Sequence, residues 1–152
     1  MTAPVVRTAV AADVAVLQGV FRRAALSNAG DRELLRARPE FLEWSGDAIA
    51  GGRVRVAVED GTVAGFATTL PVEGGLELED LFVEPDRMRR GVARRLVEDV
   101  LDTARAQGVV HVWVTANPHA MAFYTAVGFQ PDGTAPTLGG PAPRLRLDVA
   151  AR

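Results

Sequence analysis

One stretch near the middle of the chain constrains the fold most: an apolar run, a turn rich in arginine and glycine, then an amphipathic segment. The run at 81–83 favours a strand that Pro85 ends, five arginines lie between positions 87 and 95, and Gly91 precedes residues at helical spacing. A helix N-terminus leaves about four backbone N–H groups unpaired and carries about half a positive charge. Gly91 allows a ligand to approach the backbone closely. The stretch predicts a strand–turn–helix unit that binds a pyrophosphate-bearing ligand.

The composition is that of a globular protein, and residues 1–152 are interpreted as one domain. The chain is 48% hydrophobic and 24% charged, with a net charge of −2. It therefore lacks the overall basic charge of a nucleic-acid-binding protein, and no nucleic acid is expected as a partner. No apolar run approaches the ~20 residues that span a bilayer, and the N-terminus has no signal-peptide pattern. We expect a cytoplasmic location without membrane association.

The chain contains neither cysteine nor lysine, which excludes several kinds of catalytic and metal-binding site. The chain has no cysteine, which excludes thiolate metal sites and a cysteine nucleophile. His111 and His119 have no plausible companions for a zinc site, so no metal is expected. All seventeen basic residues are arginine, which excludes a lysine Schiff base and a P-loop lysine.

Apolar periodicity predicts the element order β-α-α-β-β-β-α-β-α-β, an α+β fold with a mixed sheet and helices on its faces. The predicted strands span 5–10, 53–59, 63–70, 76–83, 109–115 and 145–149, and the predicted helices begin after Asp13, lie within 31–44, and span 91–107 and 119–127. Asp60-Gly61 predicts a hairpin turn between two of the strands. Residues 131–143, rich in glycine and proline, are interpreted as a mobile loop.

Two motifs resemble those of the GNAT superfamily of N-acetyltransferases. Gly91-x-Ala93 after Pro85 resembles the acetyl-CoA signature Gln/Arg-x-x-Gly-x-Gly/Ala, although Met88 stands where the family has Gln or Arg. The second motif is carried by Asn117-x-x-Ala120-x-x-Phe123-Tyr124-x-x-x-Gly128-Phe129. The resemblance is specific from about residue 76 to 129. It implies a GNAT-like fold with a mostly antiparallel sheet, whose strands splay apart at the acyl-CoA site.

The same resemblance implies that acetyl-CoA is the acyl donor. Its pyrophosphate would rest on backbone N–H groups of residues 88–94, and nearby arginine side chains could reach phosphate oxygens. The pantetheine arm would bond the backbone near 81–83, and the N–H of Val83 would hold the oxyanion. Asn117 would contact the pantetheine or cap the helix that follows. The implied acyl-CoA-binding residues are Leu81, Phe82, Val83, Met88, Arg89, Arg90, Gly91, Val92, Ala93, Arg94, Asn117 and Tyr124.

Acetylation of a primary amine needs a base and a group that meets the departing thiolate. The strand positions that often supply the base in the family match Glu77 and Glu79. Glu79 is the first choice because it lies nearer the splay, and Glu77 is the second. A bulge could bring Asp80 in instead. Both glutamates could also line an acidic entrance or face solvent. Tyr124 matches the family tyrosine that protonates the departing CoA thiolate, and its hydroxyl could instead hydrogen-bond the thioester sulfur. The alternative interpretation is that Tyr124 is a buried residue with a structural role only. Without cysteine, direct attack is favoured over an acyl-enzyme.

Several questions stay open at the level of sequence. The acceptor could be a small amine, a peptide or protein amine, or an aminoglycoside, and the acyl-chain preference is equally open. A non-catalytic acyl-CoA-binding or regulatory module is the main alternative to an enzyme. A nucleotide-binding domain is a third interpretation, and it requires a parallel sheet instead of a hairpin at 53–70. A homodimer is possible.

Overall fold

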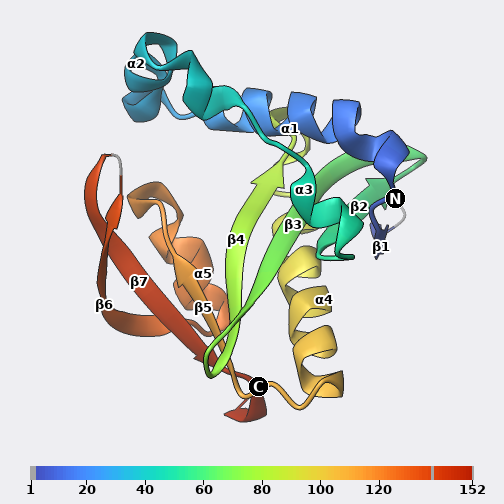
Figure 1. Cartoon of the computed structure of the whole chain (residues 1–152), viewed down its shortest axis with the longest axis vertical. Helices are drawn as coiled ribbons and strands as arrows, with labels where there is room; N and C mark the ends of the chain where they lie inside the picture. The colour runs from blue at the N-terminus through green and yellow to red at the C-terminus, as the bar shows by residue number, and fades with distance from the viewer. Residues whose placement is uncertain (1–2, 138, 152) are drawn as a thin grey trace. The chain divides into compact units, whose positions relative to one another are not determined.

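The computed structural model describes residues 3–137 and 139–151. Its strands form one sheet in the order β1-β2-β3-β4-β5-β7-β6. The strands are β1 (Val5–Thr8), β2 (Val54–Glu59), β3 (Thr62–Val72), β4 (Gly75–Val83), β5 (His111–Thr115), β6 (Gln130–Thr137) and β7 (Gly140–Asp148). The α-helices are α1 (Val14–Leu26), α2 (Ala29–Ala37), α3 (Asp47–Ala50), α4 (Val92–Ala106) and α5 (Met121–Val127). This confirms the α+β class, with a mixed and mostly antiparallel sheet (Figure 1).

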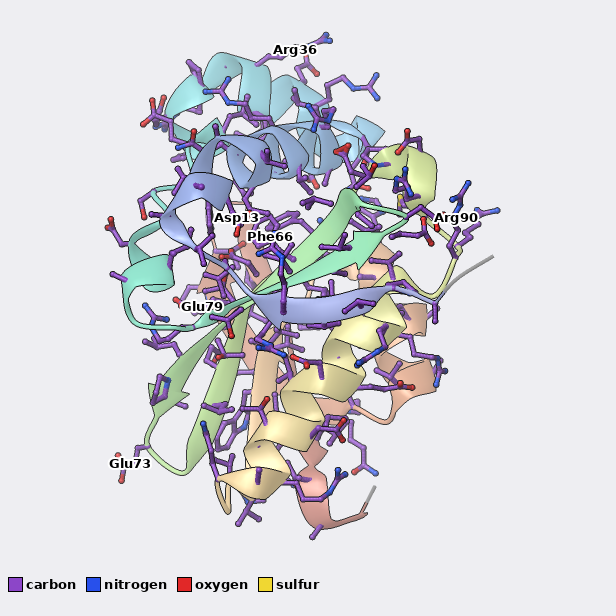
Figure 2. All side chains as sticks on the ribbon, turned by 90° about the vertical axis from the view of Figure 1, so that its right-hand side faces the viewer. Asp13, Arg36, Phe66, Glu73, Glu79 and Arg90 are labelled. Carbon is purple, nitrogen blue, oxygen red and sulfur yellow. The ribbon has the colours of Figure 1, made fainter. Side chains whose placement is uncertain are left out.

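The described residues form two compact units, one within 1–68 and 80–97 and the other within 69–79 and 98–152. In the first unit α1 packs its apolar stripe against β2 and β3. The cluster contains Ala9, Leu17, Val20, Trp44, Ala48, Val54, Val56 and Phe66, with Phe82 packed against it. Figure 2 shows Phe66 at the centre of this unit. The apolar side chains of α1 recur every three to four residues and so lie on one face of the helix. They pack against every second side chain of the strands, because successive strand side chains point to opposite faces of the sheet.

The opposite face of these strands meets the start of α4. A Cβ added at Gly65 would lie 2.6 Å from the carbonyl oxygen of Phe82 and 3.3 Å from Val92 Cγ1. Only glycine permits so close an approach of β3, β4 and α4. Helices therefore cover both faces of the sheet within this unit, as predicted.

The predicted hairpin at Asp60-Gly61 is confirmed. Both residues have positive φ, 51° and 78°, which is the conformation of a type I′ turn. β2 and β3 pair antiparallel on either side of it, from Val54 opposite Thr68 to Glu59 opposite Thr62. This pairing excludes the nucleotide-binding alternative, which required a parallel arrangement here.

In the second unit, buried apolar positions alternate with more exposed ones along β5, the start of β4 and the end of β7. The buried apolar side chains are Leu76, Leu78, Val112, Val114, Leu145 and Leu147. β4 and β5 pair in parallel from Gly75 opposite His111 to Leu78 opposite Val114, and β4 continues to Val83. β5 pairs antiparallel with β7 along its whole length.

The prediction of a mobile loop at 131–143 is wrong. β6 and β7 form an antiparallel hairpin across this segment, drawn in red in Figure 1, and the last strand begins at Gly140 instead of Leu145. Proline and glycine argued against a strand in the sequence. β6 is the edge strand of the sheet, however, and an edge strand tolerates proline because one side of it has no ladder to complete. The pairing shifts register between Pro131 and Thr134, which accommodates Gly133.

Candidate active site

The predicted strand–turn–helix unit is present. A short 3-10 turn (Pro85–Arg87) follows β4, and α4 begins at Val92. The first turn of α4 closes with the Arg95 N–H donating to the Gly91 carbonyl at 2.9 Å. The helix therefore leaves the amides of residues 92–94 without intrahelical acceptors, and they point out of its positive end.

The backbone between the turn and the helix has an unusual conformation. Arg89 and Gly91 both have positive φ, 66° and 82°. A Cβ added at Gly91 would meet nothing within 4 Å, and Met88 to Gly91 are exposed. Left-handed conformations outside glycine are uncommon, and they gather at ligand-binding sites. The loop is therefore exposed, with nothing packed over Gly91.

Two loop arginines bind a carboxylate that sequence reasoning did not find. Arg87 Nη1 and Arg90 Nη1 donate to Glu59 Oε1 at 2.6 and 3.1 Å. Glu59 is the last residue of β2, and its side chain is 1% exposed. Burial raises the pKa of Glu59, but the hydrogen bonds from the two arginines outweigh burial and hold the pKa below its usual value. Figure 2 places Arg90 on the loop that leads into α4.

The end of β4 presents its side chains by simple alternation. Asp80 accepts a hydrogen bond from Trp44 Nε1 at 3.0 Å, and the Phe82 ring lies 5.8 Å from the Phe66 ring and 4.9 Å from the Phe21 ring. Asp80 and Phe82 therefore share the face of β4 that carries the contacts with Trp44 and with Phe21 of α1. Residues 81–83 and 88–94 belong to the same unit of the chain.

The two candidate bases on β4 differ in their surroundings. Glu77 forms a two-pronged ion pair with Arg144, at 2.7 Å from Oε1 and 3.1 Å from Oε2. Arg144 also donates to Thr115 Oγ1, and its hydrogen bond with Glu77 raises the pKa of the guanidinium further. Glu79 is exposed on β4 and is labelled in Figure 2. Both oxygens of Glu77 thus belong to an ion pair, and Glu77 is less exposed than Glu79.

Tyr124 lies on α5 and is 6% exposed. Its ring packs edge-on against Phe123 and Phe129, with centroids 5.2 and 5.4 Å away. Burial raises its pKa to about 12, so the hydroxyl keeps its proton at neutral pH. Asn117 Oδ1 accepts from the His119 N–H at 3.0 Å and caps the 3-10 turn (Pro118–Ala120) before α5. Capping was one of the two roles predicted for Asn117.

The described residues offer neither a metal site nor a membrane-spanning helix. Within residues 3–137 and 139–151, no group of three or more His, Asp or Glu side chains is arranged to hold a metal ion. In the same ranges, no helix is long and apolar enough to cross a membrane.

Comparison with known proteins identifies the class. The model of the Acetyltransferase (GNAT) family matches residues 20–129. The chain belongs to this family, and acetyl-CoA is its acyl donor. It is an acetyl-CoA-dependent N-acetyltransferase that acts on a primary amine. These findings favour the enzyme over the non-catalytic module.

Two curated relatives carry more specific names. The [ribosomal protein bS18]-alanine N-acetyltransferase of Salmonella typhimurium is 37% identical over 104 residues, which cover 62% of this chain and 70% of that protein. The N-alpha-acetyltransferase RimI of Mycobacterium tuberculosis is 42% identical over 77 residues, 46% of this chain and 47% of that protein. The matched part thus spans about half the length of the second relative.

Solved structures agree on the fold. The PaiA N-acetyltransferase of Thermoplasma acidophilum, in complex with coenzyme A, superposes with a TM-score of 0.78 at 16% identity, covering 97% of this chain and 99% of that one. The acetyltransferase YncA of Salmonella typhimurium, with acetyl-CoA, gives a TM-score of 0.73 at 19% identity over 97% and 95% of the two chains. The predicted GNAT-like architecture is therefore confirmed.

Proposed function

We propose that this enzyme acetylates the N-terminal α-amine of a polypeptide. The observation that carries the proposal is the similarity to two bacterial enzymes named for alanine and α-amine acetylation, at 37% and 42% identity. The amine chemistry agrees. A free α-amine has a pKa near 8 and a lysine side chain one near 10.4, so at neutral pH the α-amine is far more often unprotonated. A carboxylate within hydrogen-bond reach, directly or through one water, can then act as the base.

The diphosphate of acetyl-CoA, the acyl donor, is proposed to bind to the main-chain amides of residues 88–94. The open space around Gly91, the left-handed Arg89 and the start of α4 support this placement. Met88 offers its backbone there, so the family's Gln or Arg side chain is not needed. The exposed side chains of Arg89 and Arg94 are candidates for the remaining phosphate oxygens, and so is Arg90 if it leaves Glu59.

The acyl end is proposed to lie along the backbone of Leu81, Phe82 and Val83. Support comes from β4, which lies between β3 and β5 and runs to Val83 beyond its ladder with β5, because an extended ligand can hydrogen-bond to the side of the strand that faces away from β3. The Val83 N–H would hold the oxyanion of the tetrahedral intermediate. Asn117 would contact the pantetheine in addition to its capping role.

For proton transfer we assign Glu79 as the base, directly or through a water. The exposure of Glu79 and its place nearer the end of β4 support this order. The amine then attacks the thioester carbonyl, the C–N bond forms, and the C–S bond breaks to release CoA thiolate.

Tyr124 is proposed to donate a hydrogen bond to the sulfur as negative charge develops there. A pKa of about 12 keeps the hydroxyl protonated but makes it a weak acid compared with a thiol of pKa about 8.5. Stabilising the thiolate by a hydrogen bond is therefore favoured over complete proton transfer. A cytoplasmic location is proposed with this activity, since polypeptides with free N-termini are made there. The homodimer stays a prediction.

Two peptides of matched length test the acceptor class. One has a free N-terminal alanine and no lysine; the other has a blocked N-terminus and one internal lysine. We expect CoA release and a mass increase of one acetyl group with the first peptide alone. Acetylation of the lysine peptide alone would overturn the assignment to an α-amine and leave the acetyltransferase activity standing.

A further inference from the structure

Glu59, Arg87 and Arg90 form an ion cluster with an uneven geometry at residues 88–91, which are called the phosphate loop for their proposed role. Arg87 and Arg90 both donate to one oxygen of Glu59, at 2.6 and 3.1 Å. The other oxygen, Oε2, is buried and has no hydrogen-bond partner among the described residues. A buried carboxylate oxygen ordinarily has a partner, so an orphan of this kind calls for an explanation.

The two arginines are placed at either end of the loop segment with the strained backbone. Arg87 ends the 3-10 turn, and Arg90 immediately precedes Gly91. Their attachment to β2 fixes the path of Met88 and Arg89 between them. A residue in the left-handed region persists only where its surroundings determine it. The two ion pairs with Glu59 flank Arg89, whose φ is 66°.

The arginines are not equivalent. Arg87 makes the shorter contact, and its side chain is 22% exposed, whereas that of Arg90 is 42% exposed. Oε2 can accept a second N–H from Arg87 when Arg90 leaves Oε1, which gives the two-pronged arrangement that a guanidinium and a carboxylate favour. Arg90 can therefore leave without stranding the buried charge.

Resting on the proposed diphosphate site, we propose that Glu59 is a positioning residue for acetyl-CoA binding: it retains Arg87 as the loop's anchor and yields Arg90 to a phosphate group of the ligand. The cluster has one negative and two positive charges, so it stays net positive toward an anion. The released guanidinium forms a charge-assisted hydrogen bond with a phosphate oxygen.

The variant Glu59→Gln distinguishes a positioning role from simple charge neutralisation, because the two roles predict opposite changes in CoA affinity. If Glu59 only neutralised charge, its loss would add one net positive charge and tighten CoA binding. With a positioning role, the loop loses its anchor and binding weakens. We expect the Kd for CoA by calorimetry, and the KM for acetyl-CoA, to rise about tenfold, with kcat at saturating acetyl-CoA changed less than about twofold. Glu73→Gln, on the exposed turn between β3 and β4 (Figure 2), is the matched control and should change neither value.

Two arginine variants keep the test sharp if Glu59→Gln does not fold. Arg90→Gln should weaken CoA binding and flatten its dependence on salt, because a direct charge contact is lost. Arg87→Gln should weaken binding with the salt dependence retained, because Arg87 acts through the loop. Equal salt dependence of CoA binding in the two variants would overturn the positioning role of Glu59. CoA binding by Glu59→Gln as tight as in the wild type would do the same. Either result would leave the proposed diphosphate site standing. A wild-type protein that binds no CoA would refute the diphosphate site itself.

Discussion

Tyr124 is the single tyrosine of the chain, which makes its chemistry directly measurable. The side chain is buried between two phenylalanine rings, and burial raises its pKa to about 12. Replacing it by phenylalanine keeps the ring packing and removes only the hydroxyl. We expect Tyr124→Phe to lower kcat about tenfold to a thousandfold with little change in the Kd for acetyl-CoA. Unchanged turnover in the free-thiol assay would remove Tyr124 from the chemistry.

The raised pKa also predicts how stability depends on pH. Above pH 10 the unfolded chain loses the tyrosine proton, while the folded protein keeps it until about pH 12. The folded state then binds more protons, so this group's contribution to folding stability falls as pH rises through that window. Tyrosinate absorbance should titrate near pH 12 in the folded protein, and Tyr124→Phe should lose that part of the alkaline destabilisation in urea unfolding. Titration near pH 10 would contradict the burial.

Glu79 and Glu77 make a matched pair for identifying the base. At high pH the amine is already deprotonated in solution, so a base matters most at low pH. We expect Glu79→Gln to lower kcat/KM most at low pH, and Glu77→Gln to lower stability through the loss of the Arg144 ion pair, with a smaller effect on rate. Glu73→Gln on the same unit serves as the control. A Glu79→Gln effect that is constant across pH would argue against the base role.

At the scale of elements, the phosphate loop was predictable because its signals are local. Pro85 ends a strand, Gly91 supplies a positive φ, and the apolar spacing of α4 follows at once. The Asp60-Gly61 turn was predictable for the same reason. The Glu59 cluster was not, because it joins residues 28 and 31 positions apart in the sequence. No local pattern distinguishes Glu59 from an ordinary strand-end residue.

The β6–β7 hairpin was predicted wrongly for a different reason: its local sequence signals were clear but misleading. Pro131, Gly133 and Pro136 argue for a loop by propensity. The position of β6 at the sheet edge removes the penalty for proline, and that position is set by tertiary structure. Likewise, α3 is too short for a periodic signal and was not predicted from sequence.

Two glycines allow the loop conformation to be tested against a matched control. Gly91 and Gly133 both have positive φ, 82° and 93°, and a Cβ at either would meet nothing within 4 Å. Alanine should therefore destabilise each by a similar amount, about 1–2 kcal/mol. We expect only Gly91→Ala to weaken CoA binding, by about tenfold, since only it redirects the amides of the phosphate loop. Equal CoA affinity in the two variants would argue against main-chain recognition at Gly91.

At the scale of the whole molecule, the net charge of −2 makes anion binding a local property. A negatively charged protein repels CoA at long range, and the attraction is proposed to come from the loop amides and nearby arginines. The family and the donor were accessible from sequence because their motifs lie in one stretch, 76–129. The acceptor was not, because residues 21–50 and 130–143 carry no motif that names an amine.

Calorimetric titration of the folded wild-type protein with acetyl-CoA tests the central claim most directly. The account predicts one site per chain with a dissociation constant between about 1 μM and 1 mM, the range of ordinary enzyme substrates. It also predicts that affinity falls as salt is raised, because the contact is made to phosphate charge. A well-folded protein that takes up no acetyl-CoA, or binds it with no dependence on salt, would contradict the account.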